Sequence, residues 1–514
     1  MVEVLEVLEV LEVGGSPALA RCARRLRAEG VFRPSRCAAR SFCVPSAPRG
    51  RAAVALVSSF GSGVAGALGH PSHFAGQVLS GGRAEAILVA AAGGRAVGLS
   101  ALVLSLSAAL PAGGRLRGGA RLLSVLCAAG LFGSVSSPLS LQGLRAAARG
   151  SRRGPAARWL LESPAPPLVS RRAVSEPLHS GVLVVDSLAP VGRGQRQLVL
   201  GDRGTGKTST CLDAVLGQAS EGAACVFASV GLRAPALLGI SFSVLARASA
   251  VAFVAASSRD RPALQYLAPY AAAALAEFFM WAGQVPVLAA LDDLTKHAAS
   301  YREVFLLLGR APGREAYPGE VFYVHARLLE RSSKLSLALG GGSVTCFPVV
   351  EALAADASAY ISTNAISITD GQLLLSLELF LAGRRPAVDA GLSVSRVGSA
   401  AQWAGQARAA GSYKIELARL ADLQSFAQLS SDLGPPARRA LERGGLLVAL
   451  LRQPCGAPLS LSQELAILSL SCGARGEQSG AASGAGAGGR ALLARAVPGW
   501  LACWCGRRPV ASAL

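Results

Sequence analysis

The residues Gly201-Asp202-Arg203-Gly204-Thr205-Gly206-Lys207-Thr208 decide how the centre of this chain folds. They match the pattern GxxxxGK[ST] of a phosphate-binding loop, an apolar run ending at Leu200 precedes them, and residues 209–216 have a helical pattern. In such a loop, backbone N–H groups surround phosphate oxygens at a helix N-terminus. The lysine reaches the β- and γ-phosphates, and the threonine hydroxyl ligates Mg²⁺. The sequence therefore predicts a site for ATP or ADP with Mg²⁺, and not an incidental glycine-rich turn.

A second element of this site is predicted further along the chain. The apolar run 285–291 reads as a strand, and it ends in Asp292 and Asp293. A carboxylate at the end of such a strand holds the Mg²⁺ of phosphate-loop proteins, through water. We therefore expect Asp292 to complete the metal site with Thr208.

An acid that hydrolysis requires is missing from the expected place. A water-orienting carboxylate typically ends the strand that follows the loop helix. Here that strand, 225–230, leads into Gly231-Leu232-Arg233. The sequence thus predicts a pocket that binds nucleotide without hydrolysing it.

The charge of the chain is unevenly distributed. The 514 residues carry a formal net charge of +20, but residues 176–473 contain 25 basic and 23 acidic residues. The basic excess lies outside the nucleotide-binding part, so no nucleic-acid-binding face is predicted there. The five histidines are dispersed, and the eleven cysteines lack the spacing of a zinc site.

Composition and periodicity divide the chain into six segments. We expect an Arg- and Ser-rich leader, either an organelle transit peptide or a basic segment without a targeting function. A divergent β-barrel, a linker, a P-loop parallel α/β domain, a helical bundle and an irregular tail follow. The predicted segments are 1–52, 53–135, 136–175, 176–402, 403–474 and 475–514. Within the α/β domain, strands are predicted at 198–200, 224–230, 251–255, 285–291 and 359–368.

Several long blocks between residues 176 and 474 resemble the alpha subunit of the rotary ATP synthase head. The resemblance is slightly closer to plastid and cyanobacterial members than to mitochondrial ones. It implies an N-terminal β-barrel, a RecA-like nucleotide-binding domain and a C-terminal helical bundle. The blocks are 176–182, 185–188, 192–196, 264–270, 314–319, 358–371 and 391–402.

The resemblance also implies roles for residues outside the phosphate loop. Arg396 matches the arginine finger that enters the catalytic pocket of the neighbouring beta subunit, where a planar guanidinium suits the developing charge. Ser358 matches a residue of the same interface. Arg385, Pro386 and Gln453 match positions beside the adenine. The chain departs from the family at four further positions, where the family has Gln, Gln, Tyr and Gln: Gly204, Leu232, Leu291 and Cys455.

The partners implied by the resemblance form a proton-translocating complex. Three alpha and three beta subunits alternate in a ring around a central rotor shaft, with a peripheral stalk alongside. Such a ring is peripheral to an energy-transducing membrane, on the stromal side of the thylakoid or the matrix side of the mitochondrial inner membrane, and no nucleic acid is expected. Two other hypotheses use the same core: a divergent P-loop protein outside any functional synthase, and a ring-shaped ATPase that translocates RNA or DNA.

Overall fold

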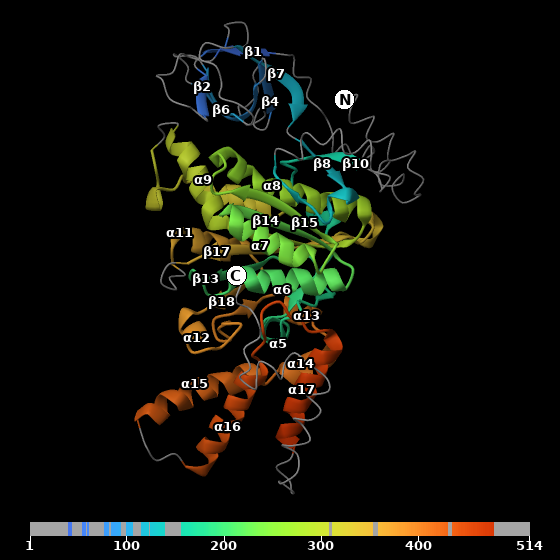
Figure 1. Ribbon diagram of the computed structural model, residues 1–514, viewed down its shortest axis with the longest axis vertical. Helices are drawn as coiled ribbons and strands as arrows, with labels where there is room; N and C mark the ends of the chain where they lie inside the picture. The colour runs from blue at the N-terminus through green and yellow to red at the C-terminus, as the bar shows by residue number, and fades with distance from the viewer. Residues whose placement is uncertain are drawn as a thin grey trace.

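The computed structural model describes residues 124–138, 156–307, 311–352, 358–429 and 434–476, together with the backbone of seven strands between residues 40 and 122 (Figure 1). The predicted tail beyond residue 476 and the predicted leader, apart from Arg40–Cys43, lie outside the described residues. None of the helices in the described part of the chain is both long and apolar enough to cross a bilayer.

The seven N-terminal strands form one antiparallel sheet in the order β2-β6-β5-β4-β7-β1-β3. Its two edge strands are separated by a single residue of sequence, which keeps the edges close together. Strand β1 comes from the segment predicted as leader, and closure into a barrel stays a prediction. The bounds are β1 Arg40–Cys43, β2 Val54–Val57, β3 Ser59–Phe60, β4 Gln77–Gly81, β5 Ala84–Gly93, β6 Leu99–Ser105 and β7 Arg115–Leu122.

Residues 124–136 pack on the central domain, although the sequence analysis placed 124–135 in the barrel. Strand β8 (Ser124–Ala128) pairs with β10 (Ala156–Leu160), which lies in the predicted linker. Strand β9 (Val135–Ser136) joins the edge of the central sheet. The reason is the alternation in β8, whose Val125 and Cys127 are fully buried in the core of the central domain.

The central sheet has eight strands in the order β19-β18-β13-β17-β16-β14-β15-β9. All neighbours are parallel except β18 and β19. Both faces are covered by helices, so its inner strands are almost continuously apolar. The bounds are β13 Gln197–Gly201, β14 Ala224–Leu232, β15 Val251–Ser257, β16 Pro286–Asp292, β17 Ser343–Glu351, β18 Gly371–Leu375 and β19 Val394–Ser395.

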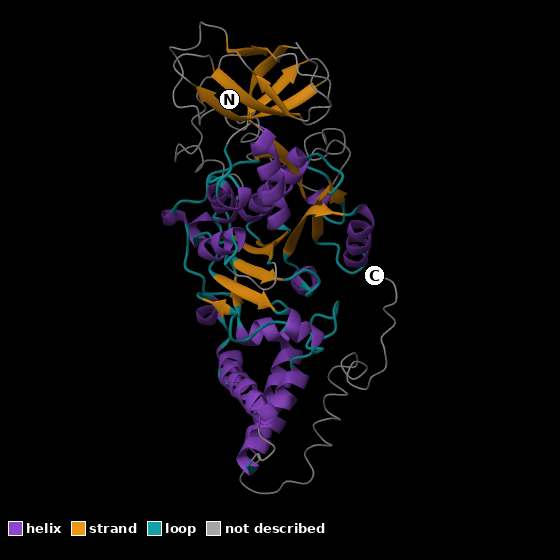
Figure 2. Ribbon diagram, turned by 90° about the vertical axis from the view of Figure 1, so that its left-hand side faces the viewer, coloured by secondary structure: helices purple, strands orange, loops and turns teal. Residues whose placement is uncertain are grey.

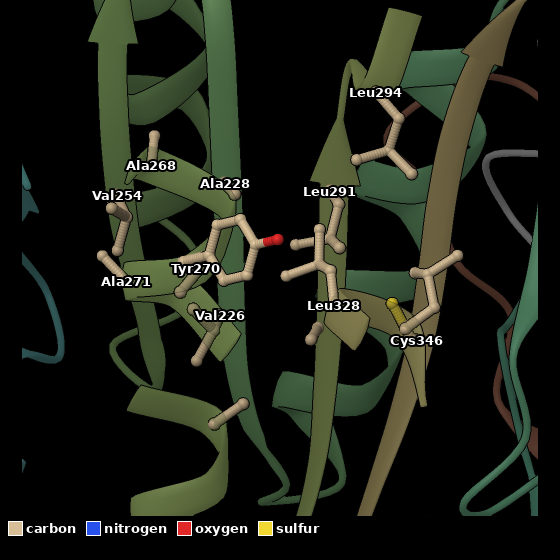
Figure 3. Close-up of a cluster of buried hydrophobic side chains, with 14 of the residues drawn as sticks. Val226, Ala228, Val254, Ala268, Tyr270, Ala271, Leu291, Leu294, Leu328 and Cys346 are labelled. Atoms are coloured by element: carbon tan, nitrogen blue, oxygen red, sulfur yellow. The ribbon is translucent and has the colours of Figure 1, made fainter. Parts of the chain in front are cut away.

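Two layers of helices enclose this sheet (Figures 1 and 2). Helices α6 (Lys207–Ser220) and α7 (Ala234–Leu245) cover one face, where Phe227 is buried. The opposite face carries α8 (Pro262–Phe278), α9 (Leu294–Leu307), α10 (Val321–Leu329) and α11 (Tyr360–Ile368). On that face Tyr270 lies among Val226, Ala228 and Val254 (Figure 3), and its hydroxyl donates to the carbonyl of Val324 at 3.0 Å.

The prediction of a strand at 359–368 is wrong, because this segment forms helix α11. Its buried residues Ile361, Ala365 and Ile368 follow the spacing i, i+4, i+7 of a helix and pack on the sheet. The strand beside β13 is instead β18, which begins just after this helix.

The C-terminal helices form a separate layer, in agreement with the helical pattern of residues 403–474. A Cβ on Gly444 would lie 2.6 Å from Leu420, so α15 and α16 approach closely at this glycine. The bounds are α14 Ala404–Ala410, α15 Tyr413–Leu429, α16 Pro435–Leu450 and α17 Leu461–Gly476. Short elements connect the layers: β11 Pro177–Leu178, α5 Leu183–Leu188, β12 Val191–Gly192, α12 Leu377–Leu381 and α13 Gly398–Ala401.

Candidate nucleotide-binding site

The phosphate loop joins the end of β13 to the start of α6. Gly204 and Gly206 have φ angles of +82° and +94°, which favour glycine. Gly201 is required for space, because a Cβ there would lie 2.6 Å from the carbonyl oxygen of Leu375. Thr205 Oγ1 donates to the carbonyl of Asp202 at 2.8 Å and closes the loop. The first N–H groups of α6 have no side-chain cap, as an anion site requires.

Lys207 places a positive charge at this loop. Its Nζ donates to the carbonyls of Gly201 and Asp202, at 2.8 and 2.6 Å. Burial lowers the pKa of Lys207, while the carboxylates of Glu351, Asp293 and Asp292 act in the opposite direction. The ammonium is thus held among acceptors that a phosphate oxygen can replace or join.

Thr208 and Asp292 come together at the metal position. Thr208 Oγ1 donates to Asp292 Oδ2 at 2.9 Å, although the residues belong to different elements. Burial raises the pKa of Asp292, which ends β16 and is only 4% exposed. A cation would offset the cost of this buried carboxylate, so the pair fits Mg²⁺.

The end of β14 offers no carboxylate. Its last residues are Gly231 and Leu232, and a Cβ on Gly231 would lie 2.9 Å from Cδ of Lys296. An open hollow of about 520 Å³ lies here, lined by residues that include Ser258 after β15 and Lys296 and Glu303 of helix α9. Strand β14 thus ends in the apolar Leu232, and the preceding Gly231 lies beside Lys296, so no side chain at this strand end can orient an attacking water.

The residues expected beside the adenine lie together, but the Gln453 side chain is engaged within the protein. Its Oε1 accepts from the N–H of Leu183 at 3.1 Å, and its Nε2 donates to the carbonyls of Gly181 and Ala457 at 2.7 and 2.8 Å. Its backbone N–H donates to the carbonyl of Arg385, which precedes Pro386. Gln453 thus ties the C-terminal segment to the residues before α5.

Asp213 is a buried acid that sequence reasoning missed. It lies on α6, and its Oδ1 accepts from the N–H of Gly456 at 2.7 Å, next to Cys455. Burial raises the pKa of Asp213 to about 6. An acid in the middle of an amphipathic helix carries no motif, so only the fold reveals this contact.

Two family models match this protein. One, described as the ATP synthase alpha/beta family nucleotide-binding domain, matches residues 181–395. The other, described as the ATP synthase alpha/beta chain, C terminal domain, matches residues 402–475. Together they cover more than half of the sequence. The protein belongs to the ATP synthase alpha/beta family. Membership of this family implies that the protein binds nucleotide and is part of an ATPase or ATP synthase complex.

In this family member, the two residues predicted at a subunit interface are exposed. Ser358 stands just before α11, and Arg396 lies past its other end, where its backbone N–H donates to the carbonyl of Asp370 at 3.0 Å. Asp370 is held in turn by two hydrogen bonds from the Arg196 guanidinium, at 2.7 and 3.0 Å. The backbone of Arg396 is thus fixed while its side chain reaches outward.

Proposed function

We propose that this protein is a non-catalytic, alpha-type subunit of a proton-translocating rotary ATP synthase. It binds ATP with Mg²⁺ and supplies Arg396 to the catalytic site of a neighbouring beta subunit. The observation that carries the proposal is a complete phosphate loop whose helix is followed in sequence by a strand, β14, that ends without a carboxylate.

The binding half of the proposal rests on charge complementarity. The start of α6, the ammonium of Lys207 and a bound cation all favour the triphosphate. Thr208 with Asp292 would hold Mg²⁺, which would supply positive charge to the triphosphate. The apolar Leu232 leaves an attacking water without a partner on β14, so bound nucleotide persists.

The in-trans half rests on the placement of Arg396. An arginine finger needs a guanidinium on a fixed backbone that projects out of its own subunit. The short strand β19 and the Arg196–Asp370 pair supply that backbone. Ser358, exposed at the other end of α11, belongs to the same proposed contact with the beta subunit.

The proposed assembly is a ring of three alpha and three beta subunits around a rotor shaft, with a peripheral stalk. The N-terminal strands would form a β-barrel, as in the family that the sequence resembles. The ring would lie on the stromal side of the thylakoid membrane or on the matrix side of the mitochondrial inner membrane. Family membership and the Arg-rich leader support this placement.

The test is reconstitution of the protein with beta subunits. Arg396→Ala is expected to lower multi-site ATPase turnover by about 10³-fold or more, because a finger contributes about 10³–10⁵ in kcat. Nucleotide binding to this subunit itself should not change. Arg408→Ala, an exposed arginine on α14, is the matched control. Normal turnover in the Arg396 variant would contradict the in-trans role, and a protein that never joins beta subunits would favour the P-loop protein outside a synthase.

A further inference from the structure

A cluster of one histidine and three carboxylates lies where the nucleotide-binding domain meets the C-terminal helices. His179 follows β11, Asp186 lies on α5, Glu221 caps the end of α6, and Glu464 lies on α17. Figure 1 shows α5 between α6 and the helices α14 and α17. Three segments far apart in sequence thus place their titratable groups at one point.

The cluster is buried and short of positive charge. Asp186 and Glu464 are 4% and 0% exposed, and His179 is nearly buried. The guanidinium of Arg193 lies 3.9 Å from Glu221, on the more exposed side of the cluster. A protonated imidazole and Arg193 leave one of the three carboxylates uncompensated, and such a buried charge is costly. A divalent cation together with Arg193 and a neutral imidazole balances all three.

Two atoms at the centre of the cluster have no hydrogen bond. His179 Nε2 and Glu464 Oε1 are buried without a hydrogen-bond partner in the described part of the protein. The other carboxylate oxygen of Glu464 accepts from Gln406 Nε2 at 3.2 Å. The Asp186 carboxylate is fixed by the N–H groups of Ser180 and Gly181. The site is therefore built and oriented, yet two of its polar atoms make no hydrogen bond.

The spacing of the candidate ligand atoms suits a tetrahedral metal ion. His179 Nε2 lies 3.1 Å from Glu464 Oε2 and 3.7 Å from Asp186 Oδ2, and one ligand atom from each residue lies within 4.8 Å of the others. Zinc bonds of 2.0–2.1 Å in a tetrahedron require ligand atoms about 3.3 Å apart. The observed contacts lie on either side of that distance.

The second nitrogen of the imidazole is already engaged as a metal ligand requires. His179 Nδ1 lies 3.2 Å from Glu221 Oε1. An imidazole bound to a metal normally donates its other N–H to a carboxylate, which fixes the tautomer and the ring. With the proton on Nδ1, Nε2 keeps a lone pair for a cation shared with the nearby carboxylates of Asp186 and Glu464. Gln218 Nε2 donates to the carbonyl of His179 at 2.6 Å and to Glu221 at 2.9 Å, which holds both groups in place.

We propose that His179, Asp186 and Glu464 bind a divalent transition-metal ion of the zinc type, with water completing the coordination and Glu221 orienting the imidazole. The ion fastens α17 of the C-terminal domain to the nucleotide-binding domain. The site is separate from the Mg²⁺ position at Thr208, because α6 has 14 residues and spans about 21 Å between them.

Cobalt is the probe, because four-coordinate Co²⁺ has intense visible bands. The metal-free, nucleotide-free full-length protein is expected to bind one equivalent of Co²⁺ with these bands, and Zn²⁺ should displace it. His179→Gln and Glu464→Gln should each lower the affinity by about 100-fold or more. Glu221→Gln should lower it by about 10- to 100-fold, as loss of an outer partner does.

Two matched variants keep the test specific. Asp292→Asn removes the Mg²⁺ carboxylate, and Glu442→Gln repeats the acid-to-amide change at an exposed position of α16, so both should bind Co²⁺ like the natural protein. Zn²⁺ should also raise the Tm of the natural protein and not that of Glu464→Gln. Absence of stoichiometric binding, or full binding in the His179 and Glu464 variants, would overturn the proposal. Thiolate-to-cobalt charge-transfer bands that persist in those variants would likewise show that cysteines hold the metal.

Discussion

At the scale of single residues, Lys207 interacts with backbone carbonyls and with carboxylates. Backbone carbonyls accept its hydrogen bonds, and carboxylates from β16 and β17 favour its charge. These acids do not take the place of phosphate as partners of the ammonium, because Asp292 belongs to the Mg²⁺ position with Thr208. The ammonium is therefore the protein's own counter-charge for the nucleotide.

Replacing Lys207 tests this role directly. Lys207→Ala is expected to weaken binding of ATP with Mg²⁺ by about 10- to 100-fold, since a hydrogen bond to a charged group contributes about 1.5–3 kcal/mol. Isothermal titration calorimetry measures the change, with Arg439→Ala on the exposed face of α16 as the control. Turnover at beta subunits of an assembled ring should be largely spared. Unchanged affinity would remove the lysine from the site.

Asp213 predicts a pH dependence of stability. Burial raises its pKa to about 6, above the value of about 3.9 for an unfolded protein, so the folded state prefers the proton. The stability that this proton contributes is complete below pH 4 and is lost as the pH rises through 6. Asp213→Asn stays neutral and keeps the acceptor for Gly456. It should exceed the natural protein by about 1–3 kcal/mol in unfolding free energy at pH 7.5 and by little at pH 4.

Urea unfolding at the two pH values measures this difference, and Asp422→Asn, exposed on α15, provides the control. An equal effect of Asp213→Asn at both pH values would show that the carboxyl group does not titrate in this window.

At the scale of elements, a buried ion pair fixes strand β10 to the central domain. Arg331 donates to both oxygens of Glu277, at 2.6 and 2.7 Å, and to the carbonyl of Leu161. Trp159 of β10 donates to the same carboxylate at 3.0 Å. Both charged residues are almost fully buried, at 2% and 3% exposure. The segment predicted as a linker is therefore part of the folded core here.

Removing one partner should destabilise this contact strongly. Arg331→Met is expected to cost about 3–5 kcal/mol, because it leaves the buried carboxylate of Glu277 without its cation. Arg327→Met, in the same region but 60% exposed and 4.0 Å from Glu162, should cost less than about 0.5 kcal/mol. Urea unfolding followed by circular dichroism measures both. Adding Glu277→Leu to Arg331→Met should recover part of the loss, and no recovery would argue against the charge explanation.

The strands that sequence predicted well are those whose apolar runs are short and bounded, such as β14 and β15. The error at α11 has a physical origin, because a mixture of Ile, Ser and Thr fits a strand by propensity while its apolar spacing fits a helix. The N-terminal part was harder: β8 and β9 are short strands whose partners are set by the central domain.

In the candidate site, too, some contacts could be predicted from the sequence and others could not. The Thr208–Asp292 contact could be predicted because a local motif and a strand end define it. The structural use of Gln453 and the cluster around His179 could not, because each joins segments more than 200 residues apart. Spacing rules for metal ligands address neighbours in sequence, and this cluster has its third ligand on α17.

At the scale of the whole molecule, the protein is expected to bind nucleotide without hydrolysing it. The purified polypeptide, without beta subunits, should release phosphate no faster than a Lys207→Ala sample, since β14 has no acid to orient water. A phosphate-release assay at saturating ATP with Mg²⁺ checks this. Brisk hydrolysis by the isolated polypeptide would contradict the non-catalytic assignment.

Helix α6 connects two distant parts of the molecule. Its first residue, Lys207, belongs to the phosphate loop, and its last turn holds His179 through Gln218. A helix resists compression along its axis, so it behaves as a rod about 21 Å long. A displacement of the phosphate loop along the axis of α6 would therefore also move the contact between His179 and Glu464 of α17, and the sheet itself need not bend. Helix α6 would thus couple the position of the C-terminal helices to the binding of the nucleotide.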